Sequence, residues 1–319
     1  MKIDLFIVYL LLSILVAYFF PHLATYQDGD FLGIVTSMGV SLIFFFYGLK
    51  LSFGQIKSGL KNWKLHVVVQ LATFVLFPLL VLLFRPFVGT FISENTWIGF
   101  FFLAALPSTV SSSVVMVSLA KGNVPAAIFN ASISGLIGVI VTPIWMSLFL
   151  NFTTENVLAD VYGGLILEII LPVILGLLLQ KYWGSWAAKH NKKLSSFDKS
   201  IILLIVYSSF AHSFEKGIFS SLGKVFILEL FIAVIILFSL VYSVLYLLSK
   251  YLLHFSEEDQ ISALFCGSKK SLTHGSVFGK FIFLNNPYAG LYFLPLMIYH
   301  AFQIFIITFI AQRYHNRKV

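Results

Sequence analysis

Two polar stretches interrupt an otherwise apolar sequence, and both carry side chains that could do chemistry. The first, Leu106–Ser113, holds one proline and five hydroxyl side chains. The second, Gly267–Gly275, is polar for nine residues and includes Lys269, Lys270 and His274. Ammonium and hydroxyl groups can bind an anion, and an imidazole can relay a proton. These residue types therefore indicate an anion or proton site.

The two lysines give the stronger signal because charge is costly inside a membrane. A charged residue at the bilayer centre costs about 2.5–3.5 kcal/mol, so Lys269 and Lys270 together would cost roughly 5–7 kcal/mol if unpaired. Snorkelling to the interface is the alternative, but both residues lie far from either end of their span. Carbonyl groups at helix ends could instead receive an ammonium, and burial could favour a neutral amine. Either arrangement would serve an anionic substrate or a proton.

The elements that position these residues must be membrane-spanning helices. Of the 319 residues, 59% are hydrophobic and 11% are charged, and the mean hydropathy is +0.94. Soluble domains have about 25% charged residues. At roughly 30 residues for a span and its connection, the chain holds about ten spans and no soluble catalytic domain. The single Cys266 excludes an intrachain disulfide and a thiolate zinc cluster.

Apolar runs predict ten transmembrane helices in an all-α integral membrane protein. They cover residues 3–20, 31–49, 64–84, 96–119, 124–150, 161–180, 200–212, 224–249, 260–284 and 288–311. The first run is longer than a typical signal-peptide core and lacks a small-x-small cleavage site, so we interpret it as a helix.

Most of the positive charge indicates topology. Fifteen of the 21 Lys and Arg residues fall on the side of the two termini, three fall opposite, and Lys269, Lys270 and Lys280 lie inside the ninth span. The positive-inside rule therefore predicts cytoplasmic termini. The net charge of +8 needs no nucleic-acid partner, and a lipid contact at Lys189–Lys193 is the alternative reading of one basic cluster.

An internal repeat appears at an offset of about 162 residues. Ser58–Lys61 is similar to Ser220–Gly223, and Gly122–Ala127 is similar to Asn285–Gly290. These matches pair spans one to five with spans six to ten, which gives repeats at 1–151 and 152–319. Because five is odd, the second repeat must be inverted. The two polar stretches then occupy equivalent places, and we expect the discontinuous fourth and ninth helices to cross near the midplane.

Four segments together resemble the bile acid:sodium symporter-like family, and in particular a bacterial branch related to the divergent seventh member of the human bile-acid carrier family. They are Ala105–Ser113, Ala120–Val124, Phe265–Leu272 and Leu294–His300. The resemblance covers nearly the whole chain. It implies a fold in which a panel of spans one, two, six and seven faces a core of the other six.

The resemblance also implies where sodium-coupled members bind their ions, and this chain departs from those members there. They carry a Gln on the third span where this chain has Thr73. They carry a Ser-Asn pair after the fourth-span break where this chain has Ser112 and Ser113. Their ninth-span break holds a Glu that serves both sodium sites, and the nearest residues here are Ser268 and Lys269. Two ammonium groups in place of a carboxylate would repel a cation.

We therefore expect a secondary transporter of a small organic anion in which a lysine ammonium occupies the place of a sodium ion. No cofactor is expected, sodium or a proton could be the coupling ion, and Ser112, Ser113 and Ser268 are the possible sodium ligands. The candidate substrate and ion site consists of Thr73, Ser108, Thr109, Ser111, Ser112, Ser113, Asn130, Ser132, Ser268, Lys269, Lys270, Ser271, Thr273 and His274. For intramembrane polar residues such as Thr73, Asn130 and Ser132, hydrogen bonding between packed helices is the equal alternative.

An intramembrane enzyme is disfavoured because the sequence has no His-Glu-x-x-His motif and no paired intramembrane aspartates. A non-transporting regulatory protein and a sodium-coupled symporter of the standard family type stay open. The expected partners are membrane lipid and the organic anion, and the expected location is the cytoplasmic membrane. The identity of the anion, the direction of transport and the oligomeric state are not predicted.

Overall fold

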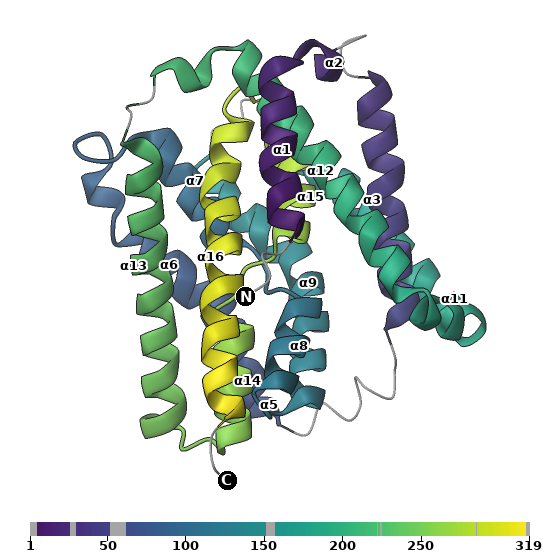
Figure 1. The fold of residues 1–319 in the computed structure, drawn as a ribbon, viewed down its shortest axis with the longest axis vertical. Coiled ribbons are helices and arrows are strands. Elements are labelled where there is room, and N and C mark those ends of the chain that lie inside the picture. The colour runs from purple at the N-terminus through teal and green to yellow at the C-terminus, as the bar shows by residue number, and fades with distance from the viewer. Residues whose placement is uncertain are drawn as a thin grey trace. The chain divides into compact units, whose positions relative to one another are not determined.

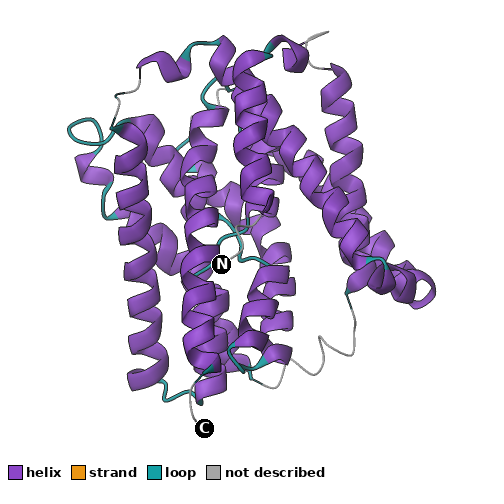
Figure 2. Cartoon of the chain, viewed as in Figure 1, coloured by secondary structure: helices purple, strands orange, loops and turns teal. Residues whose placement is uncertain are grey.

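The computed structural model describes residues 5–25, 30–51, 62–150, 157–221, 223, 225–284 and 286–316. Helices dominate these residues, and no strand is present among them (Figure 2). A single isolated bridge joins Val88 and Ile92 within the described ranges. The predicted all-α class is confirmed.

The helices follow the order of the predicted spans (Figure 1). The first half contains α1 (Leu5–Phe19), α2 (His22–Thr25), α3 (Asp30–Lys50), α5 (Trp63–Leu71), α6 (Phe77–Leu82), α7 (Glu94–Ala105), α8 (Ser111–Leu119) and α9 (Val124–Ser147). The second half contains α10 (Val157–Leu165), α11 (Leu171–Lys189), α12 (Asn191–Glu215), α13 (Phe226–Leu247), α14 (Glu257–Gly267), α15 (Leu272–Ile282) and α16 (Ala289–His315). Short π-helical segments join some of these, namely η2 (Ala72–Leu76), η4 (Ile166–Ile170) and η6 (Leu248–Leu252), and η3 (Arg85–Phe87) and η5 (Ile218–Ser221) are 3₁₀ turns.

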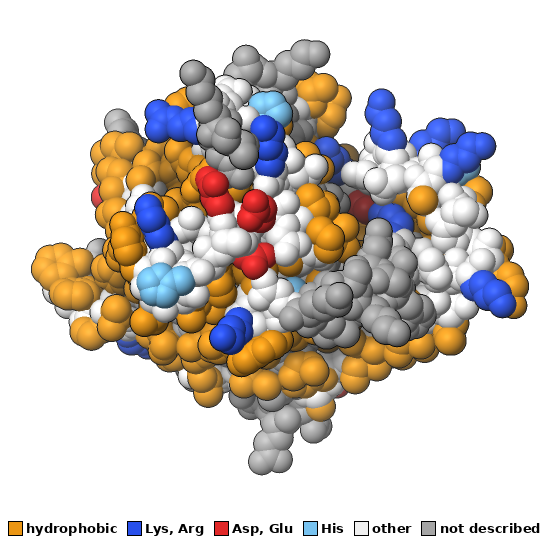
Figure 3. All heavy atoms as spheres, turned by 90° about the horizontal axis from the view of Figure 1, so that it is seen from below, with side chains coloured by type: hydrophobic (Ala, Val, Ile, Leu, Met, Phe, Trp, Pro, Cys, Tyr) orange, Lys and Arg blue, Asp and Glu red, His pale blue; other side chains and the backbone are white. Residues whose placement is uncertain are grey.

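Seven continuous helices in the described part of the chain are long and apolar enough to cross a membrane. They are Phe31–Lys50, Trp63–Phe87, Val124–Ser147, Ala159–Lys189, Asn191–Glu215, Phe226–Leu252 and Ala289–His315. The apolar α1 is shorter, and the predicted fourth and ninth spans are each divided into two helices. Large apolar side chains such as Leu178 on α11 and Leu247 on α13 stay exposed. In Figure 3, which looks onto one end of the molecule, hydrophobic side chains lie around much of the rim, and acidic side chains lie nearer the middle. The chain is a multi-pass membrane protein.

Some predicted helix boundaries are wrong. The helix predicted at 200–212 begins at Asn191, and the helix predicted to end at 180 continues to Lys189. Hydropathy detects only the apolar length of a helix, so polar turns that extend the helix beyond that length are missed. Ser58–Lys61 of the repeat comparison lies outside the described residues, as does part of its partner segment, so the inverted repeats stay a prediction.

The chain packs as two compact units. Unit 1 consists of Met1–Ser52, Ser147–Gly223 and Ser276–Phe293, and unit 2 consists of Phe53–Met146, Lys224–Gly275 and Leu294–Val319. Each unit combines segments from both halves of the sequence, so the units and the predicted repeats at 1–151 and 152–319 are different divisions of the chain.

Close helix packing in unit 1 depends on two glycines. Gly48 on α3 and Gly176 on α11 face one another, and a Cβ at Gly48 would collide with the Val173 carbonyl. A Cβ at Gly176 would likewise collide with the Phe45 carbonyl. Small residues at such positions let the backbones of two membrane helices approach closely. This contact holds α3 against α11.

Candidate functional site

The first interruption ends α7 at Ala105 because Pro107 disfavours a helical residue before it and supplies no N–H. Leu106 is accordingly extended, with φ −75° and ψ 153°. The end of a helix leaves carbonyl groups without intrahelical donors. Here other helices supply the donors: Thr142 Oγ1 on α9 donates to the Ala105 carbonyl over 2.7 Å.

Lys270, in the second interruption, supplies donors for two more of these carbonyls. Its Nζ donates to the carbonyls of Ala104 (2.6 Å), Leu106 (2.7 Å) and Thr73 (2.7 Å), which we call the carbonyl cage. The Nζ also lies 4.1 Å from the centre of the Phe77 ring. Three oxygens use all three donors of an ammonium, and the negative end of the α7 dipole points toward it. The Lys270 amine therefore contacts the end of α7, as expected for a lysine beside a helix end.

The Thr73 carbonyl can join the cage because of Pro78. In the π-helical η2 a carbonyl accepts from the residue five positions later, and the residue that would serve Thr73 is Pro78, which has no N–H. Pro78 also leaves the Phe74 carbonyl without its α-helical donor, and Trp145 Nε1 donates to it over 2.8 Å. The proline therefore exposes two carbonyls, one of which becomes a wall of the cage.

Two side chains of α16 hold the second interruption in place. The Gln303 amide accepts from the Lys270 backbone N–H and donates to the Lys270 carbonyl, each over 2.8 Å. The Tyr299 hydroxyl donates to the Ser268 carbonyl over 2.6 Å. Gln303 and Tyr299 are both fully buried. The backbone that carries Lys270 is thus fixed by hydrogen bonds on both sides.

The helix end on the other side of the crossing is capped by neutral groups. Ser108 Oγ donates to the Cys266 carbonyl over 2.5 Å, and Ser113 Oγ donates to the Phe265 carbonyl over 3.3 Å. The backbone N–H of Ser271 donates to the Pro107 carbonyl over 2.9 Å. The two interruptions therefore contact one another, and each supplies caps for the helix end of the other.

Lys269 has a different environment from its neighbour. Its Nζ donates to Ser112 Oγ over 2.9 Å, and Ser112 Oγ donates to Thr109 Oγ1 over 3.0 Å. Thr109 Oγ1 lies 2.7 Å from Ser113 Oγ, and Ser113 donates to the Phe265 carbonyl. The hydroxyl chain consequently runs in one direction, from the amine to the end of α14.

Some of the remaining predicted site residues belong to the polar centre around Lys269 and Lys270, and others lie where helices pack. Ser271 Oγ bonds to Nδ1 of the buried His274 over 2.9 Å. Asn130 instead pairs with Gln70, whose Nε2 donates to Asn130 Oδ1 over 3.2 Å. Ser132 is buried on α9, Thr273 is half-buried on α15, and the side chain of Ser111 lies outside the described residues.

This polar centre in unit 2 is closed to solvent. Ser108, Ser113, Ser268, Lys269 and Lys270 have no exposed surface. These five residues therefore form a buried hydrogen-bonded core, and all three donors of Lys270 Nζ are directed at cage carbonyls.

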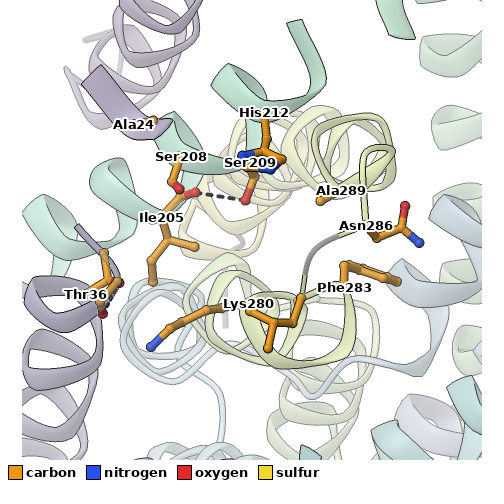
Figure 4. Close-up of a pocket in the computed structure, with 13 residues that line it drawn as sticks. Ala24, Thr36, Ile205, Ser208, Ser209, His212, Lys280, Phe283, Asn286 and Ala289 are labelled. Atoms are coloured by element: carbon orange, nitrogen blue, oxygen red, sulfur yellow. Dashed lines mark hydrogen bonds between the residues drawn. The ribbon is translucent and has the colours of Figure 1, made fainter. Parts of the chain in front are cut away.

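A pocket of about 170 Å³ lies in unit 1 (Figure 4). Its walls come from α2, α3, α12, α15 and the start of α16, and its lining residues are Ala24, Gly33, Thr36, Ile205, Ser208, Ser209, His212, Gly279, Lys280, Phe283, Leu284, Asn286 and Ala289. Lys280 Nζ donates to Glu168 Oε2 over 2.9 Å and to Ser37 Oγ over 2.5 Å. Sequence reasoning missed this pair, although an intramembrane lysine and an intramembrane glutamate are each expected to find a partner.

Interrupted membrane helices that meet at buried charge are typical of secondary transporters. The sequence profile of the SBF-like CPA transporter family matches residues 4–316, so the chain belongs to this family, and it is a membrane transporter and not an enzyme. The predicted resemblance is confirmed.

Relatives from bacteria and animals align along most of the chain. Protein PA2026 of Pseudomonas aeruginosa is 37% identical over 316 residues, which cover 99% of this chain and 94% of that protein. YfeH of Escherichia coli is 34% identical over 318 residues, covering 99% and 94%. Sodium/bile acid cotransporter 7 of Rattus norvegicus is 30% identical over 274 residues, covering 85% and 80%.

Proposed function

We propose that this protein carries a small organic anion across the cytoplasmic membrane by alternating access, and that the Lys270 ammonium takes the place of a coupling cation. The carbonyl cage carries this proposal. Three carbonyl oxygens within 2.7 Å and an aromatic face at 4.1 Å form a ligand set suited to a monovalent cation. Because the cation is covalently attached to the chain, it cannot leave and bind again during a transport cycle.

Sodium coupling through this position is therefore not needed. The name of the rat relative, sodium/bile acid cotransporter 7, refers to sodium. In this chain the Lys270 side chain fills the cage. We take a proton or the anion gradient itself to be the driving force. We take the anion to be a small one, because the described pocket that contains a lysine measures only about 170 Å³.

The transport mechanism that we propose uses ten spans in two inverted repeats, with both termini in the cytoplasm. Each of the ten predicted apolar runs overlaps a described helix, and the two interruptions lie where the sequence places them. Spans one, two, six and seven would form the panel, and the other six would form the core. Movement of one against the other would expose the anion to each side in turn.

The proposal is tested by uptake of labelled small carboxylates into proteoliposomes, with sodium and pH gradients imposed separately. Uptake by the unaltered protein should not change with the sodium gradient. Lys269→Ala and Lys270→Ala should each abolish uptake, and Lys181→Ala, at an exposed lysine on α11, should preserve it. Unchanged uptake by both buried-lysine variants would refute the proposal, as would strict dependence on sodium. Absence of uptake in every condition would favour a regulatory protein.

A further inference from the structure

The pocket in unit 1 lies beside an intramembrane ion pair that the carbonyl cage does not involve. The side chains of Lys280 and Glu168 are only 16% and 18% exposed. Lys280 reaches this position from α15, Glu168 from η4 and Ser37 from α3. Ionisable residues in membrane spans mark substrate and ion pathways.

Lys280 has capacity for a further acceptor. An ammonium has three donors, and here Ser37 and Glu168 receive two of them. The hydroxyl protons of Thr36 and Ser209 are used within their own helices: Thr36 donates to Leu32, and Ser209 donates to Ile205, as the dashed line in Figure 4 shows. Lys280 is therefore the strongest donor that the pocket offers to an anion.

The rest of the pocket suits an amphipathic molecule. Ile205, Phe283 and Leu284 supply apolar surface, and Ser208 and His212 on α12 supply polar groups (Figure 4). A small monocarboxylate has the same combination of one charged end and an apolar body.

We propose that this pocket binds the carboxylate of a small amphipathic anion through Lys280, and that Glu168 is the internal counterion with which this carboxylate competes. In the empty pocket Glu168 neutralises the ammonium. The arriving carboxylate takes the place of Glu168 at Nζ, so the affinity for anions is set by the strength of the internal pair. The choice of an anion rests on the proposed function, whereas the charge balance of the pocket does not depend on transport.

The charge balance can be measured with an introduced thiol. The sequence has a single cysteine, Cys266, which is fully buried, so Ser208→Cys adds the accessible one. In lipid nanodiscs, its rates of reaction with the anionic 2-sulfonatoethyl and the cationic trimethylammonioethyl methanethiosulfonate are compared. Adding Glu168→Gln should raise the anion-to-cation rate ratio about tenfold, and adding Lys280→Gln should lower it about tenfold, as expected for one charge at close range.

Three controls keep the test specific. Lys280→Arg retains the charge and should retain the parental ratio, which separates charge from misfolding. Ser200→Cys, exposed on the same helix, should show a ratio that neither background changes. Benzoate should slow labelling of Ser208→Cys, more strongly with Glu168→Gln and not with Lys280→Gln, whereas the neutral benzamide should have no effect.

The outcomes are distinguishable from those for transport. An unreactive thiol in every background, an unchanged rate ratio, or equal protection by benzamide would overturn the inference. Transport without these shifts would refute this site alone. Shifts in a protein that does not transport would support the site and refute the proposed function.

Discussion

The two intramembrane lysine sites, one in each unit, surround the lysine amine in different ways. In unit 2 Lys270 is surrounded by backbone carbonyls, and in unit 1 Lys280 is paired with a carboxylate side chain. A carbonyl at a helix end is fixed by the fold, whereas the Glu168 side chain can rotate away. The comparison teaches that a site with fixed ligands is suited to a permanent charge. A site with a movable ligand is suited to exchange of its counterion.

The two lysine sites also differ in burial. Lys270 has no exposed surface, whereas Lys280 lines a pocket. A charge without a carboxylate partner is tolerable in a membrane protein when carbonyl dipoles and an aromatic face surround it. We therefore expect substitutions at the two sites to differ in the size of their effect and in whether a second substitution rescues them.

The largest effect is expected at the fixed site. Lys270→Met keeps the volume of the side chain but leaves three buried carbonyls without donors, at about 1–3 kcal/mol for each. The purified variant should keep its folded peak in size-exclusion chromatography but unfold at a much lower temperature than the parent. Lys181→Met, at an exposed lysine, is the control and should behave like the parent. A melting temperature for Lys270→Met close to that of the parent would show that the cage is not structural.

The adjustable site should show rescue. Glu168→Gln or Lys280→Gln alone leaves one mostly buried intramembrane charge without its partner, at about 3 kcal/mol or less, and the double variant removes both charges. Thermal unfolding should therefore show that the double variant is more stable than either single variant. Additive losses would mean that the two side chains do not stabilise each other.

The smallest stability change is expected at Lys269, directly beside the cage. Its Nζ makes a hydrogen bond to Ser112 and receives no carbonyl cage in the described structure, so Lys269→Met should change stability by about 1 kcal/mol or less. Uptake should nevertheless be lost, because the hydroxyl chain would no longer begin at an amine. A loss of stability as large as that of Lys270→Met would remove the distinction between the two neighbours.

The sequence predicts the fold class and the interruptions because their causes are local. Pro107 ends a helix wherever it stands, and a polar stretch inside an apolar run cannot face lipid. Contact between a lysine amine and a helix end could be expected for the same reason, since Lys269 and Lys270 lie in a span that has helix ends nearby.

The different environments of Lys269 and Lys270 could not be predicted. Both lie in the unwound segment between α14 and α15, where helical periodicity does not predict the direction of a side chain. The Glu168–Lys280 pair joins residues 112 positions apart, so it depends on how distant spans pack. Both residues can be identified in the sequence as charges inside membrane spans. Their pairing depends on how α3, η4 and α15 pack, which the sequence does not show.

The central claim is that Lys270 fills a cation site permanently, and the most direct test is the sodium dependence of thermal stability. The purified protein is melted in sodium, potassium or choline chloride at constant ionic strength. We predict the same melting temperature in all three salts, and a rise specific to sodium only in Lys270→Ala, where the cage is vacated. A saturable, sodium-specific rise in the unaltered protein would contradict the claim, because a ligand that binds the folded state raises its stability with concentration.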